Sequence, residues 1–146
     1  MKVAVLFFGQ PRFFDITVSF FKRYFEQLDN VDYFAHFWDS IKYRPHQPEE
    51  LLDRNKLDTV IQLLNPITYK IQNYDPLDRF VETIIHLKNI FNNSFSPVSH
   101  NYKKHYYQYG QYCSLSTAFS LMEAWETKNK FKYDVVVKSI HSCLSF

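Results

Sequence analysis

The residues best suited to bind a ligand follow the first apolar run of the chain. Residues 3–8 are all apolar, and Gly9, Gln10, Pro11 and Arg12 come directly after them. Such a turn opens a helix, whose free N–H groups and positive dipole end favour a phosphate. Arg12 adds a planar guanidinium that can donate two parallel hydrogen bonds to an anion. The turn therefore predicts a phosphate site, and a plain strand-to-helix turn with a solvated Arg12 is the alternative.

A second group of chemistry-bearing residues closes the next apolar run, residues 31–38. His36, Trp38 and Asp39 stand near its end, where a base, an aromatic ring and a carboxylate could face one ligand. Two alternatives remain open. His36 alternates with Phe34 and Trp38, so it could point into a helix-packed face as a hydrogen-bonded core residue. Asp39 could equally cap a following turn.

Composition excludes several other kinds of site. The chain has two glycines in 146 residues, so no Walker loop, G-x-G-x-x-G fingerprint or G-x-S-x-G elbow can be written. Cys113 and Cys143 form no C-x-x-C pair, which argues against a zinc site or a disulfide framework. Two unpaired thiols favour a reducing compartment, with the cytoplasm as the default.

The charge and hydropathy of the chain limit its partners. A net charge of +2 is too balanced to predict a general affinity for nucleic acid or for anionic membranes. No stretch approaches the roughly 18 apolar residues of a membrane span. Residues 102–109 interleave basic and aromatic side chains, as single-strand binding surfaces do, but the near-neutral chain favours tyrosines packed on the domain. A protein-interaction module that uses this tyrosine-rich surface stays open as an alternative function.

The apolar pattern predicts the elements that position these groups. Continuous apolar runs indicate buried strands, and alternation of apolar and polar residues indicates a strand with one wet face. Helices are indicated by apolar residues three and four apart. The predicted strands are residues 3–8, 31–38, 67–72 and 133–138, and the predicted helices run from about 11 to 28, 49 to 64, after 76, and 105 to 129.

Alternating strands and helices predict an α/β domain with a doubly wound, mostly parallel sheet and helices on both faces. The third strand has the pattern of an edge and the first and fourth that of central strands, which favours the order 3-2-1-4. Ligands of open α/β sheets bind at the carboxyl ends of the strands where the winding reverses, here between strands 1 and 4. That position holds residues 9–12 together with Lys138 and Ser139.

Four segments taken together resemble a known family. They are a strand ending in G-Q-P-R (residues 3–12), a strand D-Y-F-x-H-x-W-D (32–39), a Tyr-Ser-Leu helix (108–115) and a strand F-K-Y-D-V-V-V-K (131–138). In this order they resemble glycosyltransferase-like proteins of bacteria, phages and large viruses, whose fold is the nucleotide-diphospho-sugar transferase (GT-A) type. The resemblance extends to the N-terminal part of such an enzyme.

The resemblance implies a transferase that binds a nucleotide-sugar donor and transfers its glycosyl group to an unspecified acceptor. It also implies a divalent cation, Mn or Mg, that stabilises the departing diphosphate. It assigns no catalytic residue. The residues that it implies for nucleotide-sugar binding are Gly9, Gln10, Arg12, His36, Trp38, Asp39, Tyr112, Ser114 and Lys138.

The chain departs from the family after the fourth strand. There the family continues into an acidic metal-binding motif, Arg/Lys-x-Arg-x-Asp or D-x-D, whereas here no Asp or Glu follows Asp134. We therefore expect an α/β domain over residues 1–138, an irregular tail over 139–146 from a truncated or frame-disrupted reading frame, and no ligands for the cation. A catalytically inactive nucleotide-binding remnant is the alternative function. The small number of strands also predicts apolar surface beside the fourth strand and some tendency to associate.

Overall fold

The computed structural model describes residues 1–11, 14–41, 50–51, 53–73 and 101–140. Within them a four-stranded sheet is formed by β1 (Val3–Gly9), β2 (Val31–Trp38), β5 (Thr68–Gln72) and β6 (Val135–Ile140). Every pair of neighbouring strands is parallel, and the order is β5-β2-β1-β6. Counted along the chain, this is the predicted order 3-2-1-4, so the predicted α/β sheet is confirmed.

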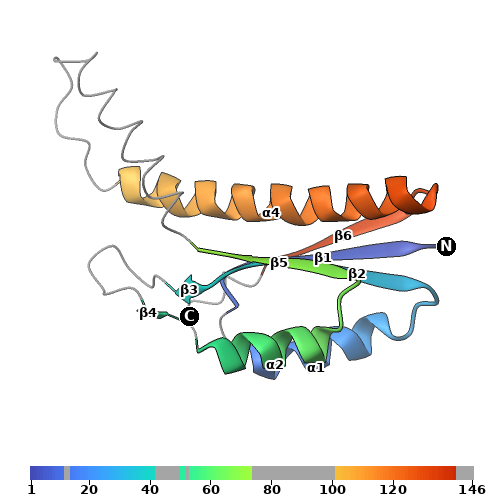
Figure 1. Cartoon of the computed structure of the whole chain (residues 1–146), viewed down its shortest axis with the longest axis horizontal. Coiled ribbons are helices and arrows are strands. Elements are labelled where there is room, and N and C mark those ends of the chain that lie inside the picture. Colours follow the sequence, from blue (N-terminus) through green and yellow to red (C-terminus); the bar gives the residue numbers. More distant parts are fainter. Residues whose placement is uncertain (12–13, 42–49, 52, 74–100, 141–146) are drawn as a thin grey trace, which may run out of the picture.

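Helices cover both faces of the sheet. The helices α1 (Phe14–Phe25) and α2 (Arg54–Leu64) lie on one face, and the long helix α4 (Asn101–Asn129) lies on the other (Figure 1). Alternate residues of β1 serve the two sides because successive side chains of a strand point to opposite faces. The α1/α2 side buries Val3, Val5 and Phe7 with Val18, Phe25, Val60 and Leu64, and the α4 side buries Ala4, Leu6 and Phe8 with Phe34, Ala118 and Met122.

Local signals explain where two of the helices end. Asp53 caps the start of α2 by accepting a hydrogen bond from the N–H of Asn55, and Asn65 ends that helix in the left-handed conformation, with φ of 49°. After α4, Lys130 has φ of 57°. Its N–H donates to the carbonyl of Thr127, while the N–H of Phe131 donates to that of Glu126. This pair of bonds is the Schellman arrangement that satisfies the last carbonyls of a helix.

The structure corrects several predicted boundaries. The fourth strand begins at Val135 rather than at Tyr133 and continues to Ile140, because the backbone N–H of Tyr133 donates to the side chain of Glu126 at the end of α4. The helix predicted from about residue 49 begins only at Arg54.

The structure also contains two strands that were not predicted, and two predicted segments lie outside the described residues. Two short antiparallel strands, β3 (Ser40–Ile41) and β4 (Glu50–Leu51), were not predicted. The helix predicted after residue 76 and the tail at 141–146 lie outside the described residues.

β6 forms one edge of the described sheet. Its run of valines predicted a central strand, yet Val135 is 40% exposed and Val136 and Val137 are half-buried. Within the described residues, therefore, the prediction of a central strand is wrong, and the prediction of apolar surface beside this strand is confirmed. Among the helices that the structure describes, none has both the length and the apolar character needed to cross a bilayer.

Candidate functional site

The winding of the sheet reverses between β1 and β6. The chain leaves β1 toward α1 on one face and enters β6 from α4 on the other (Figure 1). At the carboxyl end of β1, Phe8 pairs with Ile140 of β6, and Gly9 pairs with Phe37 of β2. The reversal between the first and fourth predicted strands is thus confirmed. Open α/β sheets bind their ligands at this edge, which lies near β3 in Figure 1.

Gly9 has an unusual backbone at this edge. Its φ is 107°, a conformation that residues with a Cβ rarely adopt, so the turn requires glycine. Its N–H donates to Oγ of Ser114, at 2.8 Å, and is therefore used inside the protein rather than offered to a phosphate. A Cβ built on Gly9 would meet nothing within 4 Å in the described part of the chain. Among the described residues, the Cα side of Gly9 is therefore open, and a ligand could approach the backbone closely there.

A buried chain of hydrogen bonds lies directly behind Gly9. Nδ1 of His36 is 2.5 Å from Oγ of Ser114, and Nε2 is 2.8 Å from Oε1 of Gln72. His36 and Ser114 are both 0% exposed. We call Gly9, Ser114, His36 and Gln72 the His36 network. Because its members come from β1, α4, β2 and β5, it joins three strands of the sheet to the helix that covers them.

The burial of His36 keeps it neutral. The pKa of His36 falls to about 4: removal from water is the largest cause, the hydrogen bond with Gln72 opposes it, and the charge of Lys70 adds a smaller lowering. Both ring nitrogens already have protein partners. The alternative of a hydrogen-bonded core histidine is therefore confirmed, and His36 is not placed to act as a base on a ligand.

Other predicted residues lie near the same edge. Trp38 is buried and packs edge-on against the ring of His36, with 4.9 Å between the ring centroids. Gln10 is buried and Asp39 is half-buried, and the N–H of Asp39 donates to the carbonyl of Gln72. Ser40 is fully buried, and within the described ranges its hydroxyl has no hydrogen-bond partner. A buried hydroxyl in this state is the kind of group that a ligand or a water molecule satisfies.

The structure places two of the predicted residues, Tyr112 and Lys138, away from this group. Tyr112 is 70% exposed and stands two residues from the buried Ser114, so it lies on the other side of α4. Lys138 is exposed and pairs with Leu6, three residues before Gly9 on β1, so it lies away from the carboxyl end of that strand. Arg12 lies outside the described residues, as do the side chains of the tyrosine-rich segment 102–109.

The acidic groups at this edge do not form a metal site in the described part of the chain. No group of three or more His, Cys, Asp or Glu side chains that could hold an ion occurs there. Asp39 supplies a carboxylate at the carboxyl end of β2, but a cation needs several such ligands. The described residues therefore do not fit a divalent cation.

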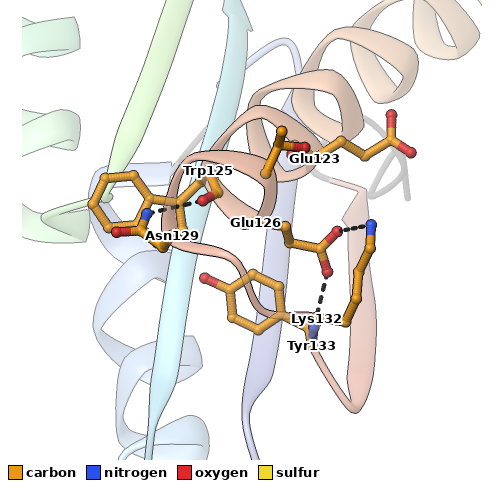
Figure 2. A network of polar contacts seen from close by, with 7 residues as sticks. Glu123, Trp125, Glu126, Asn129, Lys132 and Tyr133 are labelled. Carbon is orange, nitrogen blue, oxygen red and sulfur yellow. Dashed lines mark hydrogen bonds and ion pairs between the residues drawn. The ribbon is translucent and has the colours of Figure 1, made fainter.

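A second polar cluster lies at the opposite, amino edge of the sheet (Figure 2). The buried carboxylate of Glu126 accepts hydrogen bonds from the N–H of Tyr133, at 2.8 Å, and from Nζ of Lys132, at 2.6 Å. The hydroxyl of Tyr133 donates to Asp32 at 2.6 Å. Burial, followed by this bond, raises the pKa of Tyr133. The cluster fixes the connection between α4 and β6 and is separate from the carboxyl edge.

Sequence reasoning missed Gln72 and Ser40. Gln72 ends β5 and alternates with Thr68 and Lys70, which places its side chain on the α4 face beside His36. That position at a strand end was a usable signal.

Comparisons of the chain with models of protein families, with curated proteins and with solved structures find no match.

Proposed function

We propose that the protein binds a nucleotide-sugar at the carboxyl edge of β1 and β2, as the donor-binding domain of a glycosyltransferase with a GT-A-like fold. The observation that carries the proposal is that no described residue comes within 4 Å of a Cβ built on Gly9, which lies at the reversal point of the sheet. A glycine whose Cα faces open space lets a large ligand lie against the backbone.

The class of ligand rests on the four segments that resemble glycosyltransferase-like proteins. Two of them, residues 3–12 and 32–39, contain the carboxyl ends of β1 and β2, and a third contains Ser114, which accepts the N–H of Gly9. In this proposal Arg12 and Gln10 contact the diphosphate and Asp39 contacts the nucleoside or the sugar. In the transfer, an acceptor oxygen bonds to the anomeric carbon while the bond from that carbon to the phosphate oxygen breaks. The nucleoside diphosphate then leaves with the electron pair.

The proposal assigns donor binding and leaves the proton of the acceptor without an assigned base. A divalent cation remains part of what the resemblance implies, but no step is derived through it because the described residues do not supply its ligands. Binding of the donor is therefore the property to test first.

The test is calorimetric titration of the full chain with UDP-sugars and GDP-sugars, with and without Mn²⁺. We expect saturable binding by at least one donor, and loss of that binding in Arg12→Ala. Thr127→Ala is the matched control, since within the described residues its hydroxyl bonds to the carbonyl of Glu123 on the exposed side of α4. Binding that survives Arg12→Ala would contradict the site assignment, and no binding by any donor would contradict the proposed function.

A second candidate function, association with a second copy of the chain through α1, is favoured by one observation. Phe20 and Tyr24 are 72% and 70% exposed and stand one turn apart on α1, so they lie on the same face of that helix. Exposed aromatic groups of this kind mark interaction surfaces. Sedimentation of the wild type and of the Phe20→Glu/Tyr24→Glu variant tests it: association lost in the variant would support this function, and monomers in both would contradict self-association through this face.

A further inference from the structure

We infer that Ser114 is a positioning residue of the proposed site: held by His36 in its Nε2–H form, it fixes the Gly9 turn against which the ligand binds. The role in ligand binding rests on the proposed function. The hold on Gly9 does not, and it can be measured without any ligand.

The contact joins the middle of α4 to the last residue of β1. Ser114 is fully buried in α4, and its Oγ accepts the N–H of Gly9 at 2.8 Å. Gly9 has φ of 107°, so its peptide is turned in a way that few other residues could maintain. The position of the open Cα side of Gly9 therefore depends on the position of the Ser114 hydroxyl.

The protons of the network can be assigned from its donors and acceptors. Oγ of Ser114 lies 2.5 Å from Nδ1 of His36 and 3.1 Å from the carbonyl oxygen of His36, and one hydroxyl proton can serve either acceptor. Neutral imidazole carries a single N–H. Since Oε1 of Gln72 accepts at Nε2, that nitrogen holds the hydrogen and Nδ1 accepts from Ser114.

In the resulting chain of hydrogen bonds each group donates to the next: Gly9 to Ser114, Ser114 to His36, and His36 to Gln72. Hydrogen bonds aligned in this way polarise one another in a buried environment. The geometry thus makes His36 the group that orients the Ser114 hydroxyl, and Ser114 the group that orients the Gly9 peptide. Ligand affinity therefore depends on His36 and Ser114 even if neither side chain contacts the ligand.

The first test measures hydrogen exchange of the Gly9 amide by NMR. Ser114→Ala deletes the acceptor, and Thr117→Val deletes a hydroxyl one turn along α4 whose partner in the described part of the chain is the carbonyl of Cys113. The amide of Val5, in the middle of β1, reports global unfolding in each variant. We expect exchange of Gly9 relative to Val5 to rise about fivefold to tenfold in Ser114→Ala, the factor that one hydrogen bond typically contributes, and to stay unchanged in Thr117→Val.

The second test separates His36 as an orienting group from His36 as a filler of space. In His36→Asn the side-chain oxygen can still accept from Ser114, whereas in His36→Leu nothing can. We expect Gly9 to remain protected in His36→Asn and to lose protection in His36→Leu. In the wild type, ¹⁵N signals of the ring should show Nε2 protonated and Nδ1 unprotonated. Equal Gly9 exchange in both variants, or a proton on Nδ1, would overturn the inference.

The third test connects the hold on Gly9 with the proposed ligand. If the wild type binds a UDP-sugar or GDP-sugar, Ser114→Ala should weaken binding about fivefold to tenfold and Thr117→Val should leave it unchanged. Unchanged affinity in Ser114→Ala would overturn the positioning role. Absence of binding in the wild type would count against the proposed function, and the exchange of Gly9 would still decide whether Ser114 holds the turn.

Discussion

The hydroxyl of Ser114, in the buried face of α4, accepts the backbone N–H of Gly9, 105 residues earlier in the chain. Through this hydrogen bond, α4 fixes the position of the backbone where β1 ends. It also explains why Gly9 presents its Cα, rather than its amide, at the edge where ligands of such sheets bind. Because the His36 network already uses the N–H of Gly9, that N–H is not offered to a ligand.

The first prediction concerns acid stability. The pKa of His36 is about 4 in the folded protein because the ring is buried, and about 6.5 in the unfolded chain. The unfolded chain therefore takes up a proton first, and this part of the stability is complete above pH 6.5 and is lost as the pH falls toward 4. The loss between pH 7.5 and pH 5 should be about 2 kcal/mol.

Urea unfolding at these two pH values checks that prediction, with His36→Asn as the matched control. The control cannot take up a proton at this position, so its free energy of unfolding should change less over the same interval. Equal losses in the two proteins would show that another group causes the acid sensitivity.

The second prediction concerns Gly9→Ala. The added methyl group meets open space within the described residues, so no clash is expected. The cost comes from holding alanine at φ of 107°, and a strained backbone of this kind costs about 1–3 kcal/mol. Thermal and urea unfolding measure the loss. If the alanine protein is as stable as the wild type, Gly9 does not adopt this conformation.

The third prediction concerns the cluster in Figure 2. Glu126→Ala removes the acceptor of the buried Tyr133 N–H, and a buried donor left without a partner costs about 1–3 kcal/mol. Glu126→Gln keeps an acceptor oxygen and should lose less. Lys132→Ala should have little effect, since the Lys132 side chain is largely exposed and surface ion pairs contribute little. Equal losses in Glu126→Ala and Glu126→Gln would contradict this account.

The pH dependence of the Glu126 contribution distinguishes it from that of His36. Hydrogen bonding, first with Lys132 and then with the backbone of Tyr133, lowers the pKa of the Glu126 carboxyl, and burial opposes this. A depressed carboxyl pKa adds stability that is present above the ordinary value of 4.5 and is lost at lower pH. The difference in unfolding free energy between the wild type and Glu126→Gln should therefore stay constant above pH 4.5 and shrink below it, outside most of the His36 interval.

Much of the fold could be predicted from the sequence because apolar periodicity reports burial directly. The strand order was predicted from the edge pattern of residues 67–72 and the apolar runs of residues 3–8 and 133–138, and it is confirmed although the last of these runs forms an edge of the described sheet. The boundary at Tyr133 could not be predicted, because a side chain from α4 takes its N–H. Apolar pattern carries no information about such a contact.

The sequence predicted which strand ends form the candidate site, but not which side chains contact one another there. The residues that end β1 and β2 meet at one edge because parallel strands place their carboxyl ends together. The bond between Ser114 and His36 joins residues 78 positions apart, and the exposed side of Tyr112 depends on how α4 is rotated against the sheet. Neither follows from spacing along the chain.

The measurement that tests the central claim most directly is an NMR titration of the ¹⁵N-labelled full chain with UDP-sugars and GDP-sugars. The account predicts saturable shifts of the amides of Gly9, Gln10 and Asp39 at the carboxyl edge, while the amides of Glu126 and Tyr133 at the amino edge stay unchanged. Shifts confined to the amino edge or to α1, or no shifts with any donor, would contradict it.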